Sequence, residues 1–518
     1  MTNDLSLNYL LDQPSAAAAR PTPEQLLQLP ETVLQFGTGA LLRGLPDYLI
    51  DKANRAGIFN GRIVVVKSTD GGDLTAFRRQ DNLYTLCIRG VEQGRTVEEN
   101  VICSAISRVL SARTEWESVL QLAGNPDLKL VISNTTEVGI QLVQDDIRQT
   151  PPQSFPGKLL AVLYARYQAF GGDRDRGLVI VPTELIPDNG ARLEAILLEL
   201  AHRNGLESDF IDWLESANTC CNSLVDRIVP GRPDPTTLHD LADQLGYDDE
   251  LLTIAEVYRL WAIEVPDGPN ASRVTEVLSF SRADAGVFIR PNIGLFRELK
   301  LRLLNGTHTL SCGMAWLSGF DTVREAMDDE TMGAFIRSLM LAELLPGIPY
   351  PVDEKTAQRF ATDVLDRFQN PYIEHRWLSI TMQYTAKMQM RNVPTLLQYY
   401  RQLGTTPAYM PLGFAAYLLF MRGTHQPAES GGLWYGDRDG TPYPIQDEKA
   451  GYFADIWSRS TPAQVVSTVL SNKSLWGHDL TLLPGFAERV HEALEQFLNQ
   501  GLYATLAARF TKSVLLDK

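Results

Sequence analysis

The sequence predicts an α/β protein with an N-terminal Rossmann-type domain, residues 1–290, followed by a mainly α-helical domain, residues 291–518. A chain of 518 residues is too long for one ordinary core, so two domains are expected. In the first half, short apolar runs alternate with helical stretches. Such runs become scarce after about residue 291, where long amphipathic segments replace them.

Four short runs rich in Val, Ile and Leu predict the strands of the first domain. Runs of this kind, separated by helices, are typical of parallel strands buried on both faces. They lie at residues 32–36, 62–66, 128–133 and 178–182, with helical periodicity at 114–122, 158–169 and 191–202. This order indicates a doubly wound sheet.

The second half has a different pattern. Amphipathic segments at residues 296–311, 331–345, 354–368 and 485–499 predict helices. We therefore expect a mainly helical domain, and a cleft where it meets the first.

The composition argues against some classes of binding partner. With 47 basic and 63 acidic residues, the net charge of −16 disfavours nucleic acid and anionic membrane surfaces as partners. No apolar window approaches the roughly 20 residues of a membrane-spanning helix. Five scattered cysteines do not form a disulfide framework, so we expect a reducing, cytoplasmic location. An anionic substrate would need a local cationic pocket.

A glycine-containing turn follows the first predicted strand. Gly37 and Gly39 allow a tight turn and close approach of a pyrophosphate, and the following helix supplies N–H donors. The third glycine of the usual fingerprint is replaced by Leu42, so an ordinary strand-to-helix turn is the alternative. The position on the first strand favours dinucleotide binding. The cofactor-binding candidates here are Phe36, Gly37, Thr38, Gly39 and Arg43.

The end of the second strand bears on the choice of cofactor. Asp70 is placed to bind the ribose hydroxyls of NAD. Lys67 and Ser68 are equally suited to a 2′-phosphate, so this spacing leaves NAD and NADP open.

Residues 298–310 carry the most informative polar pattern. At 100° per residue, Asn305 lies about 140° and His308 about 80° around a helix from Lys300, so the three share one broad face. A lysine, an amide and an imidazole can together transfer a proton, hold an oxyanion and orient a hydroxyl. The alternative is a solvated polar face.

Other catalytic patterns are missing from the sequence. The seven histidines show no metal-ligand spacing, and there is no Cys-x-x-Cys pair or His-Glu-x-x-His helix, so no metal is expected. There is also no Gly-x-Ser-x-Gly elbow and no phosphate-binding P-loop. Hydride chemistry remains as the prediction.

The segment Lys300-x-x-x-x-Asn305-x-x-His308 resembles the signature of the mannitol dehydrogenase family of polyol-specific long-chain dehydrogenases. The resemblance covers roughly residues 30 to 500 and includes further segments at 37–43, 133–139, 187–190, 222–228 and 367–371. It implies a Rossmann-type domain, a helical domain, no metal, and hydride transfer between NAD(H) and a ketone or secondary alcohol.

The same resemblance implies roles for individual residues. Lys300 would be the general acid in reduction and the general base in oxidation, while Asn189 and Asn305 would form an oxyanion hole. His308 would hold the substrate and help to position Lys300. The cofactor-binding residues that the resemblance adds are Asn134, Thr135 and Glu137.

The resemblance also implies substrate contacts at two further positions. Asp226 and Lys387 match substrate-binding positions of the family, although Asp226 could instead form only an ion pair with its neighbour Arg227. Where polyol-oxidising members have an arginine, this chain has Ser379, and two basic residues lie slightly earlier. We hypothesise that Lys387, with His375 or Arg376, binds a uronate carboxylate.

Segments at 134–137, 304–309, 319–327 and 370–375 are similar to a hexuronate-reducing branch of the family. We therefore expect reversible, NADH-dependent reduction of D-tagaturonate to D-altronate in hexuronate catabolism. Fructuronate reduction and neutral polyol oxidation are alternatives, and a non-enzymatic NAD-binding sensor is a remote one. The sequence leaves the oligomeric state and the physiological direction open.

Overall fold

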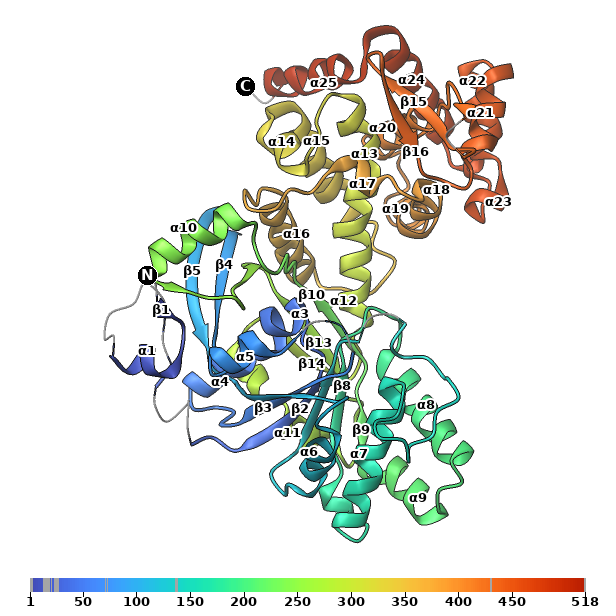
Figure 1. Cartoon of the computed structure of the whole chain (residues 1–518). Coiled ribbons are helices and arrows are strands. Elements are labelled where there is room, and N and C mark those ends of the chain that lie inside the picture. Colours follow the sequence, from blue (N-terminus) through green and yellow to red (C-terminus); the bar gives the residue numbers. More distant parts are fainter. Residues whose placement is uncertain are drawn as a thin grey trace. The chain divides into compact units, whose positions relative to one another are not determined.

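The computed structural model describes residues 3–12, 19, 21–22, 28–69, 71, 73–135, 138–428 and 431–516. The chain divides into two compact units (Figure 1). The first unit comprises Met1–Gly90 and Thr96–Ile293, and the second comprises Val91–Arg95 and Gly294–Lys518.

A six-stranded parallel sheet forms the centre of the first unit. Its strand order is β6-β3-β2-β7-β8-β9, and every neighbouring pair is parallel. The strands are β2 (Glu31–Phe36), β3 (Arg62–Lys67), β6 (Ile106–Ser111), β7 (Leu130–Ser133), β8 (Val179–Pro182) and β9 (Thr219–Cys220). The four predicted strands are thus present. The chain leaves β2 toward β3 and later continues on its other side with β7, so the order reverses at β2, where ligands of open α/β sheets bind.

Helices cover both faces of this sheet, as the sequence predicted. Alternate strand residues such as Val65 and Val64 point to opposite faces, so each face has its own apolar core. One core is closed by α4 (Tyr48–Arg55) and α11 (Ala271–Val277). The other is closed by α6 (Trp116–Gln121), α7 (Phe155–Ala169), α8 (Asn189–Arg203) and α9 (Ser208–Ala217), of which Figure 1 shows α8 and α9 together at one edge.

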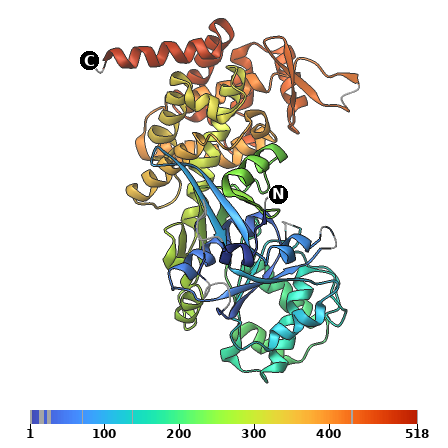
Figure 2. The ribbon, with the colours of Figure 1, turned by 60° about the vertical axis from the view of Figure 1, so that its left-hand side comes forward.

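Additional strands extend the first unit beyond the predicted pattern. One three-stranded sheet consists of β12 (Thr253–Glu256), β4 (Tyr84–Glu92) and β5 (Arg95–Cys103). Figure 2 shows β4 and β5 as a long pair in light blue. Another contains β10 (Ser223–Asp226), β13 (Leu260–Glu264) and β14 (Val287–Arg290). The first unit also contains α1 (Leu7–Asp12), α3 (Ala40–Leu42), α5 (Thr75–Arg79), α10 (Pro235–Leu245) and the β1–β11 pair (Asn3–Asp4, Tyr247–Asp248).

The second unit is mainly helical, as expected. Helix α20 (Met410–Phe420) is buried along nearly its whole length and packs against α13 (Thr307–Leu317) and α24 (Phe486–Gln500). Further helices are α14 (Val323–Asp328), α15 (Glu330–Ser338), α16 (Glu354–Phe368), α17 (Trp377–Ile380), α18 (Tyr384–Lys387), α19 (Val393–Leu403), α21 (Ala450–Arg459), α22 (Pro462–Leu470), α23 (Lys473–Trp476) and α25 (Leu502–Leu516). One hairpin, β15 (Trp434–Arg438) with β16 (Thr441–Ile445), interrupts them. Within the described ranges, none of the helices has the length and apolar character needed to cross a membrane.

Two π-helical segments lie side by side in this unit. The first, η5 (Lys300–Gly306), joins α12 (Gly294–Leu299) to α13 without a break, and the second, η7 (Met388–Asn392), joins α18 to α19. A π-helix is bonded from residue i+5 to residue i, and such segments are frequent at functional sites. The predicted residues Lys300 and Asn305 both lie in η5.

Candidate active site

The turn after β2 has the shape that a dinucleotide-binding loop needs. Gly37 adopts φ +123°, and its N–H donates to the Val66 oxygen at 3.0 Å. A Cβ at Gly37 would lie 2.8 Å from the Asn134 oxygen and 2.8 Å from Leu42 Cδ1, so glycine alone fits. A Cβ at Gly39 would meet no atom within 4 Å. The main chain is therefore open at Gly39, which fits close approach of a pyrophosphate.

Arg43 is hydrogen-bonded to this glycine turn. Its Nη1 donates to the Thr38 oxygen at 2.7 Å, and its Nε donates to Thr253 Oγ1 at 3.2 Å. Burial lowers the pKa of Arg43, with Tyr84 and Asp47 opposing that shift. Because these contacts are internal, Arg43 acts on the loop conformation.

Phe36, a predicted cofactor-binding residue, ends β2 with its side chain inside the sheet. Its side chain is fully buried and lies 5.2 Å from the Phe155 ring, ring centre to ring centre. The Phe36 side chain therefore belongs to the sheet core, because β2 alternates its residues between the two buried faces. Only its main chain is placed at the turn.

A second loop follows β7, beside the glycine turn. Asn134 Nδ2 donates to the oxygen of Thr183 at 3.1 Å and to its Oγ1 at 3.0 Å. The Asn134 N–H donates to the Phe36 oxygen at 3.1 Å. These bonds place Asn134 at the carboxyl edge of the sheet, next to Gly37. The predicted cofactor residues Asp70 and Glu137 lie outside the described residues.

Glu184, which is not among the predicted site residues, organises this second loop. Its carboxylate accepts hydrogen bonds from the N–H and the hydroxyl of Thr135, both at 2.9 Å, and from Ser133 Oγ at 3.1 Å. Glu184 is buried, and burial raises its pKa while these hydrogen bonds oppose the shift. The available signal was an acidic residue just after the predicted strand at 178–182.

Asn189, expected to form part of an oxyanion hole, is hydrogen-bonded to main chain. Its Nδ2 donates to the main-chain oxygens of Pro182, Glu184 and Ser223 at 3.0–3.1 Å. Its Oδ1 accepts from the N–H groups of Gly190 and Ser223. The amide is thus committed to the backbone where α8 begins, which leaves no donor for an oxyanion.

Asp226 ends β10 and is buried. Its neighbour Arg227 donates through Nε to the Glu256 oxygen at 2.9 Å and through Nη1 to the Gly44 oxygen. The Arg227 guanidinium also lies over the Tyr48 ring at 5.0 Å. Arg227 therefore fastens main-chain segments of the first unit together.

In the second unit, η5 presents Lys300 and Asn305, both half-buried. The 100° estimate for this segment was wrong, because the segment is π-helical and not α-helical. The wider turn brings residues five apart nearer to the same face, since i+5 bonds to i. Arg302 fixes η5 against η7 by donating through Nη1 to the oxygens of Met390 and Arg391 at 2.7 and 2.8 Å.

His308 lies in a basic and aromatic environment. Its ring stacks on Phe368 at 4.2 Å between centroids and meets His375 edge-on at 4.8 Å. Burial lowers its pKa well below 6.5, and the nearby basic residues His375, Arg367, Arg391 and Lys387 lower it further. The imidazole is therefore neutral at pH 7. Its Nε2 is buried without a hydrogen-bond partner in the described part of the chain.

The three basic residues assigned to carboxylate binding differ in burial and in hydrogen-bond partners. Lys387 is half-buried, donates through Nζ to the Ile380 oxygen at 3.0 Å, and has a pKa lowered by burial and then by Arg391. His375 contacts His308, as described. Arg376, by contrast, is 67% exposed and pairs with Glu374 at 2.8 Å, so the structure does not place it with the other two.

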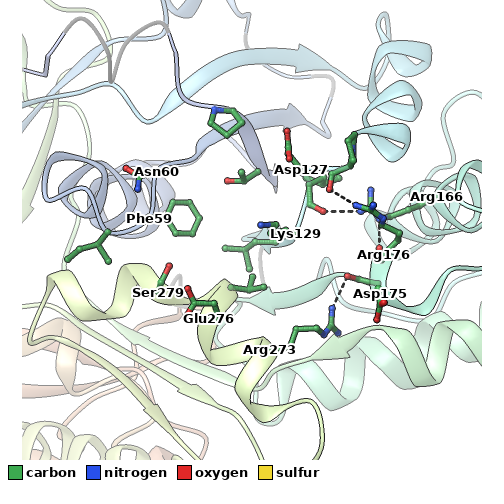
Figure 3. A pocket seen from close by; sticks show the side chains of 18 residues that line it. Phe59, Asn60, Asp127, Lys129, Arg166, Asp175, Arg176, Arg273, Glu276 and Ser279 are labelled. Carbon is green, nitrogen blue, oxygen red and sulfur yellow. Dashed lines mark hydrogen bonds between the residues drawn. The ribbon is translucent and has the colours of Figure 1, made fainter.

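A cavity of about 480 Å³ lies at the opposite, amino-terminal edge of the sheet (Figure 3). Its arginines serve the fold: Arg166 donates to the oxygens of Ala123, Asn125, Leu128 and Arg176, and Arg273 to those of Gly177 and Ala217. None of the predicted site residues lines it. The described residues contain no group of three metal-ligating side chains.

A doubly wound sheet with a glycine turn at its switch point is followed by a mainly helical unit. The chain is a two-domain oxidoreductase that acts on CH–OH groups. Family models agree with this class. The mannitol dehydrogenase Rossmann domain matches residues 31–274, and the mannitol dehydrogenase C-terminal domain matches residues 292–498. The chain belongs to the mannitol dehydrogenase family.

Two relatives of this chain are altronate oxidoreductases. The chain is 38% identical over 485 residues to an altronate oxidoreductase of Halalkalibacterium halodurans, covering 92% of each chain. It is 38% identical over 491 residues to an altronate oxidoreductase of Bacillus subtilis, covering 92% of this chain and 96% of the relative.

Two solved structures share the fold. Mannitol 2-dehydrogenase of Pseudomonas fluorescens, in a ternary complex with NAD and D-mannitol, has a TM-score of 0.63 at 22% identity. It covers 98% of this chain and 100% of the other. A substrate-free D-sorbitol dehydrogenase has a TM-score of 0.74 at 19% identity with the same coverage.

Proposed function

We propose that this chain reversibly reduces D-tagaturonate to D-altronate with NADH. The observation that carries the proposal is the basic environment of His308 in the unit that holds Lys300 and Asn305. A chain of net charge −16 places Arg367, Arg391 and Lys387 near this imidazole, which suits an anionic substrate. The altronate oxidoreductases at 38% identity support the same substrate.

The first unit would hold the cofactor. The main chain at Gly37, Thr38 and Gly39 would face the pyrophosphate, and the loop of Asn134 and Thr135 would lie at the same carboxyl edge. NAD is proposed because the solved mannitol 2-dehydrogenase complex contains NAD. When bound, the reduced cofactor supplies the hydride.

The second unit would manage the proton and the developing charge. Lys300, as an ammonium group, would deliver the proton to the carbonyl oxygen in reduction and recover it in oxidation. Asn305, in the same π-helical segment, would donate to the growing oxyanion. We leave Asn189 out of this oxyanion hole because its amide is bonded to main chain.

Neutral His308 would orient a substrate hydroxyl. A neutral imidazole can donate from one ring nitrogen and accept at the other. Its unpartnered Nε2 is the atom available for such a bond. Lys387 and His375 would bind the acidic end of the substrate, and Asp226 would contact its hydroxyls.

The test is NADH consumption with D-tagaturonate, D-fructuronate and D-fructose in parallel, repeated with NADPH. Fast turnover of D-tagaturonate with NADH is expected. Preference for D-fructuronate or D-fructose would retain the oxidoreductase class and overturn the proposed substrate. Equal rates with NADPH would overturn the proposed cofactor preference.

A further inference from the structure

Two basic side chains occupy one face of the α18–η7 helical run. Lys387 ends α18, and Arg391 lies four residues later in η7. Both are half-buried, and neither forms an ion pair with a carboxylate of the described residues. The charge of Asp447 acts on Lys387 and raises its pKa. The Asp447 carboxylate, however, accepts hydrogen bonds from the N–H groups of Thr385 and Lys449.

Like charges four residues apart on a helix repel each other. This arrangement costs stability in a protein that has 63 acidic residues from which a counter-charge could have been placed. Partly buried cations that lack a counter-charge are candidate binding groups for an anion. The pair Lys387–Arg391 therefore indicates an anion site in the second unit.

The guanidinium of Arg391 is only partly satisfied by the protein. Its Nη1 donates to Thr309 Oγ1 at 3.0 Å. Its Nε is shut off from solvent and has no hydrogen-bond partner within the described part of the chain. Burial lowers the pKa of Arg391, yet a guanidinium remains charged at every physiological pH. The described residues therefore do not offset the desolvation cost of this buried donor.

Arg391 is held directly against the segment that carries the proposed catalytic groups. Thr309, its hydrogen-bond partner, follows His308 and donates to the main-chain oxygen of Asn305 at 2.7 Å. The next residue, Asn392, donates through Nδ2 to the Gly306 oxygen at 3.0 Å. These bonds join η7 to η5 and α13, so the Arg391 guanidinium has a fixed position relative to Asn305 and His308.

We propose that Arg391, which the sequence analysis did not single out, binds the substrate carboxylate and sets the preference for sugar acids over neutral ketoses. The inference rests on the proposed function. A planar guanidinium can pair with a carboxylate through two parallel N–H···O bonds, whereas Lys387 adds a point charge. Arg376, the arginine expected from the sequence, is exposed and paired with Glu374.

The experiment compares D-tagaturonate with D-tagatose, its neutral counterpart, in which a hydroxymethyl group replaces the carboxylate. In Arg391→Met, kcat/KM for the acid should fall about 100-fold or more, mainly through KM, because one partner of a charged hydrogen-bonded pair is lost. For the neutral ketose, measured by turnover or as a competitive inhibitor, the change should stay below about threefold. Arg401→Met removes an exposed arginine of α19 and is the matched control.

Two further variants guard against a purely structural effect. In Arg391→Ala, added guanidinium ion should restore part of the turnover of the acid and none for the neutral ketose. Arg391→Lys keeps the charge without the planar fork, so its loss for the acid should be intermediate. NADH binding, followed by fluorescence, should be unchanged in all Arg391 variants.

The outcomes separate the two proposals. Equal losses for acid and neutral ketose, or an acid-selective loss in Arg376→Met instead of Arg391→Met, would overturn the role of Arg391 alone. If Arg391→Met does not fold, the same comparison in Arg391→Lys decides. A wild-type enzyme that reduces D-tagatose but no sugar acid would overturn the proposed function itself.

Discussion

The carboxylate of Glu184 accepts two hydrogen bonds from Thr135, one from its N–H and one from its hydroxyl, each 2.9 Å long. These two hydrogen bonds join the residues after β8 to the loop after β7. Both lie at the edge of the sheet where the glycine turn also lies. The loop conformation thus depends on a buried acid that the sequence analysis did not single out.

Glu184→Gln should loosen this loop, because an amide cannot accept at both of its polar atoms. We expect a loss of about 1–3 kcal/mol in the free energy of unfolding. The dissociation constant for NADH should rise about tenfold, since roughly 1.4 kcal/mol corresponds to that factor. Urea unfolding and NADH fluorescence titration measure the two effects. Glu199→Gln, at an exposed ion pair with Arg203, should change stability by less than about 0.5 kcal/mol.

Gly37→Ala should disrupt the glycine turn. The new Cβ would lie 2.8 Å from the Asn134 oxygen, at a φ of +123° that side chains rarely adopt. We expect a destabilisation of about 1–3 kcal/mol together with weaker NADH binding. Thermal unfolding of Gly39→Ala supplies the comparison, because a Cβ there meets no atom within 4 Å. Similar losses of stability in both variants would contradict this account.

Lys300→Ala should remove the proton donor and leave the first unit intact. Turnover should fall by about two to four orders of magnitude, the usual contribution of general acid catalysis. NADH binding should remain close to that of the wild type, because the glycine turn belongs to the other unit. Single-turnover kinetics and fluorescence titration provide the measurements. Retained turnover would remove Lys300 from the mechanism.

Lys387→Met should discriminate between charged and neutral substrates. The KM for a sugar acid should rise about tenfold or more, because a charge-assisted hydrogen bond is lost. The KM for a neutral ketose should change far less. Steady-state kinetics with D-tagaturonate and D-fructose measure the difference. Equal effects on both substrates would exclude Lys387 from carboxylate binding.

Asp47→Asn should change how stability depends on pH. Burial raises the pKa of Asp47 from 3.8 to about 7, although hydrogen bonding from Gln35 and the charge of Arg43 oppose the shift. The folded state therefore retains a proton that the unfolded state releases above pH 3.8, so the contribution of Asp47 to stability falls as the pH rises through this interval.

Relative to the wild type, Asp47→Asn should gain stability as the pH increases from about 4 to about 7 and should level off above that. Urea unfolding at a series of pH values gives the comparison. Parallel pH profiles for the two proteins would show that Asp47 does not titrate in this way.

Local patterns in the sequence were sufficient for the main architecture. The four apolar runs predicted strands correctly, because a strand buried on both faces needs nearly continuous β-branched residues. Gly37 was identified correctly as a turn residue for the same kind of local reason. The strands of the additional sheets were not predicted, since their pairing joins segments far apart in the chain, such as β4 with β12.

Individual site residues depended more on three-dimensional context. Asn189 was assigned to an oxyanion hole by its position in a motif, but its amide is bonded to main chain around β8 and β10. Arg376 and His375 were left as alternatives for carboxylate binding, and the Arg376 guanidinium pairs with Glu374. Sequence spacing cannot show which acceptor a polar side chain reaches.

The sequence by itself determined the four central strands and the helices between them, the glycine turn, and the spacing of Lys300, Asn305 and His308. These features follow from residue type and local periodicity. Only the tertiary structure decided which basic residues surround His308 and that Arg391 is held by Thr309. The physical reason is that burial and hydrogen bonding arise when η5, α13 and η7 pack together. Residues more than 80 positions apart in the chain then form one electrostatic environment.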